Sequence, residues 1–321
     1  MPDLTDTEND AGDTVPMEAP KPTPIPYLKD PLSDLMGWTR YFCAAEIPVL
    51  AATSEALEEF RLTEDDVGPA ELAAIIESDP FMTVKLMAYV ASHRQPGEIT
   101  ETETVVSSLV MMGITPFFNH FGKQLTVEDR LADQPKALEG LQRLMKRGQR
   151  AAHFAMGFAV HRGDTDAAII SQAAFLHDFA EMLMWCHAPT MMLEIKEMQR
   201  TNPTLRSASL QRFVFNIDLA DLRQELLKIW HMPELLVRIS DGKLPNHPNV
   251  RNVLLAGRLA RHTMDGWDNA ALPDDVRDIA HLLNAAPRVV LAYLQKIELQ
   301  EAEEAAESQL PDGDEAAKSA A

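Results

Sequence analysis

Signals for helix starts and stops recur along this chain, whereas the alternating pattern of a β-strand is nearly absent. Asp79-Pro80 combines a capping carboxylate with a proline at the first helical position. Thr104 precedes an apolar segment that ends at Gly113, a further pairing of cap and stop. Between such signals, apolar residues recur at the three- and four-residue spacing of a helix. These patterns predict an all-α fold.

The same signals divide the second half of the chain into helices with one apolar side each. The segment that contains the single His-Asp pair is predicted as one continuous helix. The predicted ranges are 136–161, 166–186, 189–200, 207–215, 219–230, 233–240, 248–264, 274–283 and 287–304.

The two ends of the chain differ in composition from its interior. Residues 1–27 are rich in Pro, Asp, Glu and Thr, and residues 298–321 carry eight acidic residues against one lysine. Segments of this kind bury too little apolar surface to offset the entropy of ordering them, so we expect two disordered acidic tails. Residues 28–297 are expected to form an all-helical domain with a C-terminal helical extension.

The formal net charge is −20, which disfavours nucleic acid and anionic membrane surfaces as partners. Cys43 and Cys186 are the only cysteines, and this predicts reduced thiols and no disulfide framework. Residues 1–25 lack the basic and apolar segments of a secretory signal, and no apolar run is long enough to span a bilayer. We therefore expect a cytoplasmic protein.

One His-Asp pair, His177 and Asp178, interrupts an apolar segment that runs from Phe175 to Glu181. Imidazole and carboxylate can share a divalent metal, although a metal site requires further ligands. In the alternative interpretation, the pair is a buried polar cluster that hydrogen bonds satisfy. Glu181 lies one turn after His177, where it would either bond the imidazole or point to solvent.

Six short segments, taken in order, carry a family resemblance. They are Ile47-Pro48-Val49-Leu50, Leu72-Ala73-Ala74-Ile75-Ile76-Glu77-Ser78-Asp79-Pro80, Lys85-Leu86-Met87, Leu109-Val110-Met111-Met112-Gly113-Ile114, Phe175-Leu176-His177-Asp178 and Trp230-His231-Met232-Pro233. Their order and spacing resemble the HDOD (HD-related output domain) family, over about residues 35–260. The resemblance implies an HD-like helical bundle that serves bacterial signal transduction. It also implies kinship with HD and HD-GYP metal phosphohydrolases, although HDOD domains are usually treated as non-catalytic.

The resemblance also implies which residues correspond to the metal ligands of HD hydrolases. His153 is similar to the first ligand, on an upstream helix, and His177 with Asp178 is similar to the pair. Gly257 stands where the closing Asp is expected, and we interpret it as a position of close helix packing. Glu181 stands where a Lys is common. We therefore expect vestigial metal ligands, with no bound metal, no other cofactor and no catalytic residue.

Four basic residues share one side of the helix predicted at 136–161. Arg143, Lys146, Arg147 and Arg150 follow one another at three- and four-residue intervals, and apolar residues occupy the opposite side. This arrangement predicts that the basic side faces outward. It is either a solvated face or a docking surface for an acidic partner, a nucleotide or the chain's own Glu-rich C-terminal tail.

The sequence thus favours a non-catalytic regulatory protein of a bacterial signalling pathway, acting through protein–protein contacts. The first alternative is a metal-dependent phosphohydrolase or phosphodiesterase that acts on nucleotides or cyclic dinucleotides. The second alternative is a nucleotide-sensing module without catalysis.

Overall fold

The computed structural model of the 321-residue chain describes residues 26–93, 103–202 and 204–307. Within these ranges every regular element is a helix, apart from one isolated bridge between Val49 and Thr126. The predicted all-α fold is confirmed. In the same ranges, no helix combines the length and the apolar character needed to cross a lipid bilayer.

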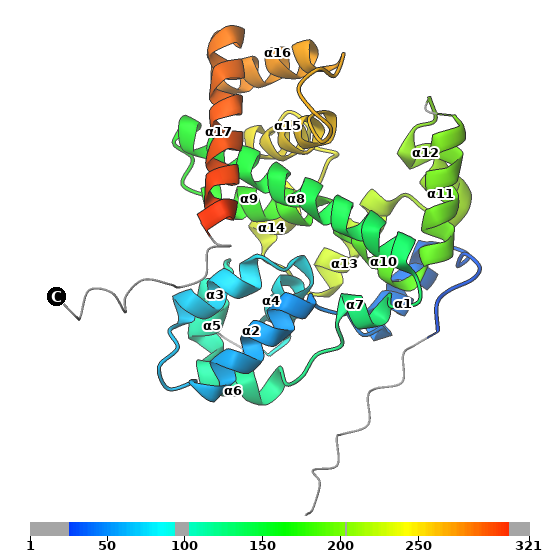
Figure 1. The fold of residues 1–321 in the computed structure, drawn as a ribbon, viewed down its shortest axis with the longest axis vertical. Coiled ribbons are helices and arrows are strands. Elements are labelled where there is room, and N and C mark those ends of the chain that lie inside the picture. Colours follow the sequence, from blue (N-terminus) through cyan, green and yellow to red (C-terminus); the bar gives the residue numbers. More distant parts are fainter. Residues whose placement is uncertain (1–25, 94–102, 203, 308–321) are drawn as a thin grey trace, which may run out of the picture.

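The first part of the chain forms short helices, most of which surround a small core of their own. They are α1 (Leu35–Ala44), α2 (Ala51–Leu62), α3 (Pro69–Glu77), α4 (Pro80–Ser92), α5 (Val105–Met112), α6 (Ile114–His120) and α7 (Val127–Arg130). Leu72, Ile76, Leu86 and Phe117 are fully buried in this core. Figure 1 shows α2–α6 grouped together at one end of the molecule.

The second part of the chain forms a larger assembly of helices. They are α8 (Pro135–Arg162), α9 (Ala167–Phe175), a 3-10 turn η1 (Leu176–Asp178), α10 (Phe179–His187), α11 (Pro189–Thr201), α12 (Ser207–Phe215), α13 (Leu219–Ile229), α14 (Glu234–Ile239), α15 (Pro248–His262), α16 (Leu272–Leu283) and α17 (Pro287–Glu307). Apart from the interruption of 166–186 by η1, the predicted ranges agree with these helices to within a few residues.

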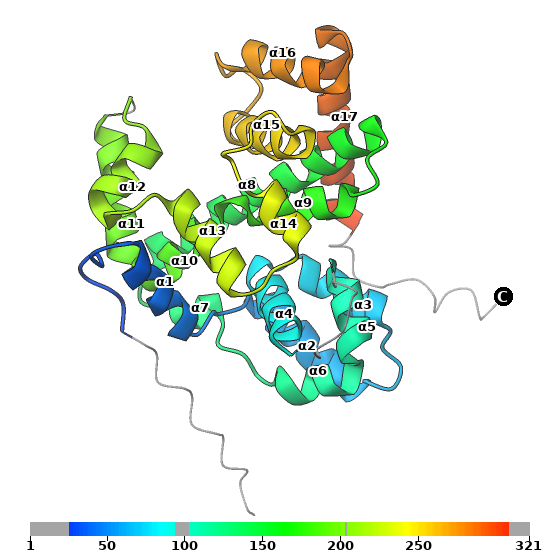
Figure 2. The same cartoon turned by 180° about the vertical axis from the view of Figure 1, so that it is seen from behind.

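The 28-residue helix α8 forms the centre of the larger core. Its side chains Phe154 and Phe158 are fully buried, and α9 and α15 pack along it. At Gly140 the helix meets the ring of Trp185, and a Cβ at this glycine would lie 2.5 Å from that ring. Figures 1 and 2 show α8 running between the α2–α6 group and the α15–α17 group, with α13 and α14 on the far side.

The Asp79-Pro80 signal does start a helix, and its carboxylate does more than cap it. Asp79 accepts hydrogen bonds from the amides of Phe81 and Met82 at the start of α4, and from the amide of Leu50 at 2.8 Å. Asp79 therefore also ties α4 to the segment that leads into α2, and its side chain is fully buried.

The helix predicted at 166–186 is interrupted, and this prediction was wrong. His177 and Asp178 lie in the 3-10 turn η1, which separates α9 from α10. No Gly or Pro marks the break, so the local sequence gives no signal for it. Contacts from other helices stabilise the turn: Arg223 donates to the backbone carbonyl of His177, and Arg147 donates to the Asp178 carboxylate.

Both predicted tails include residues that contact the helical body, so both tail boundaries are corrected. Tyr27 lies 4.6 Å from the Arg130 guanidinium and donates to Asp133 at 2.8 Å. Glu298 forms an ion pair with Arg150 at 2.6 Å, and α17 continues to Glu307. Tyr27 and Glu298 thus contact the helical body, while predicted tail residues 1–25 and 308–321 lie outside the described residues.

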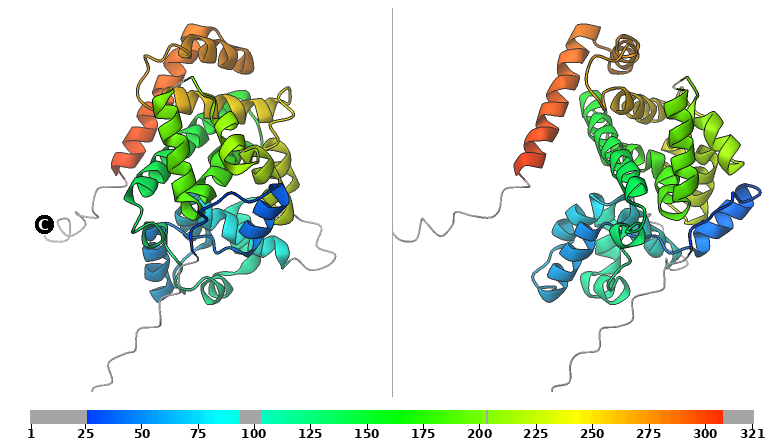
Figure 3. Two further views of the ribbon diagram at one scale, coloured as in Figure 1. Left: turned by 90° about the vertical axis from the view of Figure 1, so that its right-hand side faces the viewer. Right: turned by 45° about the vertical axis from the view of Figure 1, so that its right-hand side comes forward.

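Helix α17 packs on α8 through a narrow apolar stripe. Val290 and Leu294 are buried, and the Tyr293 hydroxyl donates to the carbonyl of Gly157 at 2.7 Å. The side chain of Ile297 fills the space at Gly157, where a Cβ would lie 2.5 Å from it. Figure 3 shows α17 at an outer edge of the molecule. The helical extension predicted after the main domain is therefore part of the packed structure.

Candidate functional site

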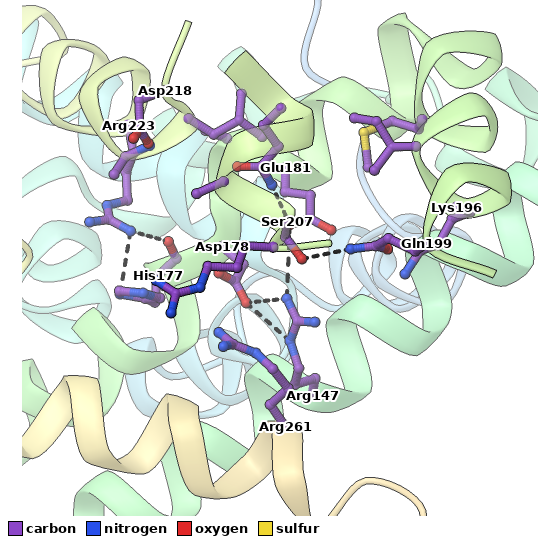
Figure 4. Close-up of a pocket in the computed structure, with 18 of the residues that line it drawn as sticks. Arg147, His177, Asp178, Glu181, Lys196, Gln199, Ser207, Asp218, Arg223 and Arg261 are labelled. Atoms are coloured by element: carbon purple, nitrogen blue, oxygen red, sulfur yellow. Dashed lines mark hydrogen bonds and ion pairs between the residues drawn. The ribbon is translucent and has the colours of Figure 1, made fainter. Parts of the chain in front are cut away.

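A polar cavity of about 520 Å³ lies where η1 and α10 meet the surrounding helices. Figure 4 shows its charged side chains converging from several helices, with Arg223 and Lys196 on opposite sides and Arg147 and Arg261 between them. The polar residues that line it are Arg147, His177, Asp178, Glu181, Lys196, Gln199, Arg206, Ser207, Gln211, Asp218, Arg223 and Arg261. The His-Asp pair predicted from sequence therefore opens onto a cavity.

Arg147 engages the carboxylate of Asp178. Its Nη2 and Nε atoms lie 2.6 and 3.2 Å from the same oxygen, Oδ2, and both side chains are mostly buried. Burial acts to raise the pKa of Asp178, but the guanidinium of Arg147 outweighs it and holds that pKa well below its usual range. Asp178 is therefore a carboxylate whose charge an arginine already balances.

Arg223 engages His177 in a similar way. The Nη1 atom of Arg223 lies 3.3 Å from Nδ1 of His177 and also donates to the His177 carbonyl. A guanidinium can only donate, so Nδ1 must be the acceptor nitrogen of a neutral imidazole. Burial and the charge of Arg223 lower the pKa of His177 to about 4, which keeps the ring neutral at pH 7.

Glu181 lines the cavity beside these pairs. Its carboxylate accepts a hydrogen bond from Gln211 at 3.3 Å and lies 3.9 Å from Nη2 of Arg147. The two positions that we expected for it, bonded to the imidazole or in solvent, are both wrong. Burial raises the pKa of this carboxyl group, in spite of Arg147.

His153, the third residue of the expected ligand set, is not part of this cavity. Its side chain is exposed on α8, whereas His177 and Asp178 are partly buried. In the parts of the chain that the structure describes, no three His, Cys, Asp or Glu side chains are close enough together to hold a metal ion. The structure therefore does not bring His153, His177 and Asp178 into one cluster.

Gly257 is not the close-packing position that we expected. A Cβ built at this residue would meet no atom within 4 Å, so the space beside it is open. One turn further along α15, Arg261 reaches the cavity that contains Asp178. The α15 helix thus contributes a cation to this site, and sequence comparison with HD hydrolases gave no indication of it.

We expected the basic side of α8 to face outward, and the structure corrects this expectation. Arg143 and Lys146 are exposed, and Arg143 pairs with Asp265 at 2.6 Å. Arg147 points into the cavity instead, and Arg150 is buried, where it bonds the hydroxyl of Thr263. The residue spacing correctly places the arginines on one side of α8, but α15 and η1 cover much of that side. Among the expected partners, Glu298 from the acidic C-terminal segment does pair with Arg150.

Four cations of the cavity were not predicted from the sequence. Lys196, Arg206, Arg223 and Arg261 come from the region of α11, α12, α13 and α15, respectively. No local pattern marks them as members of one site: Arg200 follows Lys196 by four residues and Arg258 precedes Arg261 by three, but these neighbours do not line the cavity. Only the packing of these helices places the four around one space.

The neutral state of His177 predicts a pH dependence of stability. Its pKa is about 4 in the folded protein and about 6.5 when unfolded, so the unfolded chain takes up the proton first. The contribution of His177 to the free energy of unfolding is complete at pH values above the pKa of the unfolded chain. It is lost as the pH falls toward 4. Between pH 7 and pH 5 we expect this group to remove about 2 kcal/mol from the free energy of unfolding.

The measurement is urea denaturation at both pH values, followed by circular dichroism. The variant His177→Gln should lose this part of the pH dependence, whereas His281→Gln, at an exposed position on α16, is the matched control. Equal pH dependence in the two variants would contradict the assignment.

A comparison with protein families identifies the chain. The HDOD domain model matches residues 47–241, which is more than half of the sequence. The chain belongs to the HDOD family, and the resemblance noted in the sequence is confirmed. Helices α15–α17 lie beyond the matched residues. No curated protein sequence matches the chain significantly.

Solved structures share this fold. The MmoQ response regulator from Methylococcus capsulatus str. Bath superposes with a TM-score of 0.56 at 18% identity, over 75% of this chain and 98% of that one. A virulence factor from Campylobacter jejuni subsp. jejuni gives a TM-score of 0.53 at 15% identity, over 83% of this chain and 99% of that one. At these identities, the likeness establishes the fold alone.

Proposed function

We propose that this HDOD protein is a regulatory component of a bacterial signalling pathway and works through protein contacts, without catalytic turnover. One observation carries the proposal: arginines already engage Oδ2 of Asp178 and Nδ1 of His177, two atoms that could otherwise bind a catalytic metal. A similarly folded protein is described as a response regulator, which supports a role in signalling. The acidic charge of the chain favours proteins over nucleic acids or membranes as partners. A cytoplasmic location is part of the same proposal.

The side chains around the His-Asp pair do not fit a divalent metal. Metal-dependent hydrolysis needs several ligands on one ion and a position for an activated water. Here Arg147 lies within hydrogen-bond distance of Asp178, and a metal at that oxygen would have to displace it. A cation close to Asp178 and His177 would also meet the positive charges of Arg223 and Arg261. We therefore derive no hydrolytic step at this site.

The proposal is tested by a hydrolysis assay with the full chain. Cyclic dinucleotides, nucleoside triphosphates and a generic phosphodiester are incubated with the protein, with and without added Mn²⁺. We expect product formation at the level of buffer alone for every substrate. Hydrolysis that disappears in a well-folded Asp178→Ala variant would establish the phosphohydrolase alternative in place of the regulatory one.

A further inference from the structure

The charges that line the cavity are unbalanced. Five of its residues are cationic and three are acidic, on a protein whose net charge is −20. Two of the acids, Asp178 and Glu181, are both within 4 Å of the same cation, Arg147. The third, Asp218, caps α13 by accepting from the amide of Ala220 at 3.0 Å. The remaining cations therefore have no carboxylate within ion-pair distance, and Asp178 and Glu181 act on Arg261 and Lys196 only from farther away.

Those four cations surround one cavity, and none of them is bonded directly to a carboxylate. Arg223 is buried and bonds only carbonyl oxygens and a neutral imidazole, so no carboxylate is bonded to it directly. Asp178, Asp218 and Asp241 act on its charge only through space. Lys196, Arg206 and Arg261 form no hydrogen bond or ion pair through their side chains in the described parts of the chain. Some exposed cations elsewhere, such as Arg200 and Arg277, pair with neighbouring carboxylates, but the four cavity cations are distinguished by converging on one space. An unpaired cluster around a cavity creates a local positive potential.

The start of α12 adds to this potential. The helix begins at Ser207 with no side chain bonded to its first amides, and Arg206, Ser207 and Ala208 all line the cavity. Uncapped amides at a helix start carry partial positive charge and suit phosphate oxygens. The Ser207 hydroxyl accepts from Gln199 at 2.7 Å, which leaves its own proton available to donate.

Apolar side chains complete the other part of the wall. Met192, Ile195, Leu205 and Leu219 line the same cavity as the cations. A volume of about 520 Å³ falls within the range of sites that hold small organic molecules. The cavity thus combines a cationic region for an anion with an apolar region for an organic group.

We propose that this cavity binds a small organic phosphate, whose phosphate group is held by Lys196, Arg206 and Arg261 at the start of α12. The organic part lies against the apolar wall, and Arg223 supplies a buried positive charge. The inference rests on the proposed function in one respect: the ligand is bound as a signal and is not converted. A ligand bound at the junction of η1, α11, α12 and α15 would stabilise one arrangement of these helices relative to another.

The test is isothermal titration calorimetry of the full chain with four probes. These are adenosine monophosphate, inorganic pyrophosphate, uncharged adenosine and, as an anion without phosphate, succinate. We expect saturable binding of at least one phosphate probe in the millimolar range or tighter, weakened by added salt, and no measurable binding of adenosine.

The decisive variant is Lys196→Gln combined with Arg261→Gln. Both side chains are exposed and unpaired, so their removal should leave the fold intact. Each lost charge-assisted contact is expected to weaken binding about tenfold or more. The matched control is Lys228→Gln with Arg277→Gln, which removes two exposed cations away from the cavity. Circular dichroism verifies that both double variants are folded.

Three results would overturn the inference. They are the absence of saturable binding of both phosphate probes, equal binding by the two double variants, and equally tight binding of succinate, which would indicate a general anion site. The injected adenosine monophosphate is also analysed for hydrolysis. If it is bound and hydrolysed, the phosphate site stands while the non-catalytic function fails, so the two proposals are distinguished.

Discussion

Replacing Asp178 with alanine is expected to lower the free energy of unfolding by about 2–3 kcal/mol. The substitution leaves the Arg147 guanidinium, whose side chain is only 19% exposed, without its hydrogen-bonded carboxylate, and only Glu181, at 3.9 Å, remains near it. Breaking a mostly buried ion pair is costly because the remaining charge loses its closest compensation. Urea denaturation at pH 7, monitored by circular dichroism, measures the change.

A double variant separates the pair from its surroundings. The variant that carries both Arg147→Met and Asp178→Leu removes both charges of the pair and leaves Glu181 with its hydrogen bond from Gln211, so it should be more stable than Asp178→Ala alone. If Asp178→Ala is as stable as the parent chain but removes a measurable phosphatase activity, the residue is catalytic. If the pair is structural, Asp178→Ala lowers the free energy of unfolding, and no phosphatase activity is there to be lost.

Truncating Leu294 to alanine is expected to cost about 3 kcal/mol. Leu294 is fully buried on α17, which packs against α8 and α16, and truncating its side chain leaves a cavity beneath the helix. The matched control is Leu299→Ala on the same helix, where the side chain is 64% exposed and the cost should stay within about 0.5 kcal/mol. Both values come from urea denaturation.

The comparison of these two variants tests whether α17 belongs to the folded body. Similar stabilities would show that α17 does not stay packed on α8 in solution. A large difference would show that the helix beyond the family match contributes to the stability of the protein.

The sequence predicted the helices well because their signals are local. Asp79-Pro80 marks a helix start through interactions within a few residues, and structure confirms it. The same locality explains the failure at His177 and Asp178. The turn that contains them depends on Arg223, which is 46 residues away from His177, so no window around the pair reveals it.

The site was only partly predictable for a related physical reason. Helical spacing correctly placed Arg143, Arg147 and Arg150 on one side of α8, but spacing does not say what that side faces. The structure packs α15 and η1 there, which turns Arg147 toward Asp178 and buries Arg150. The cation on α15, Arg261, comes from beyond the family match and could be located only from the packing of the helices.

The metal content of the purified 321-residue chain tests the central proposal most directly. The protein is prepared without added metal or chelator, and iron, manganese and zinc are quantified by mass spectrometry against protein concentration. Because Arg147 and Arg223 engage the His-Asp pair, we predict no stoichiometric divalent metal. About one tightly held equivalent, lost in a folded Asp178→Ala variant, would contradict the proposal and assign the site to a metal-dependent enzyme.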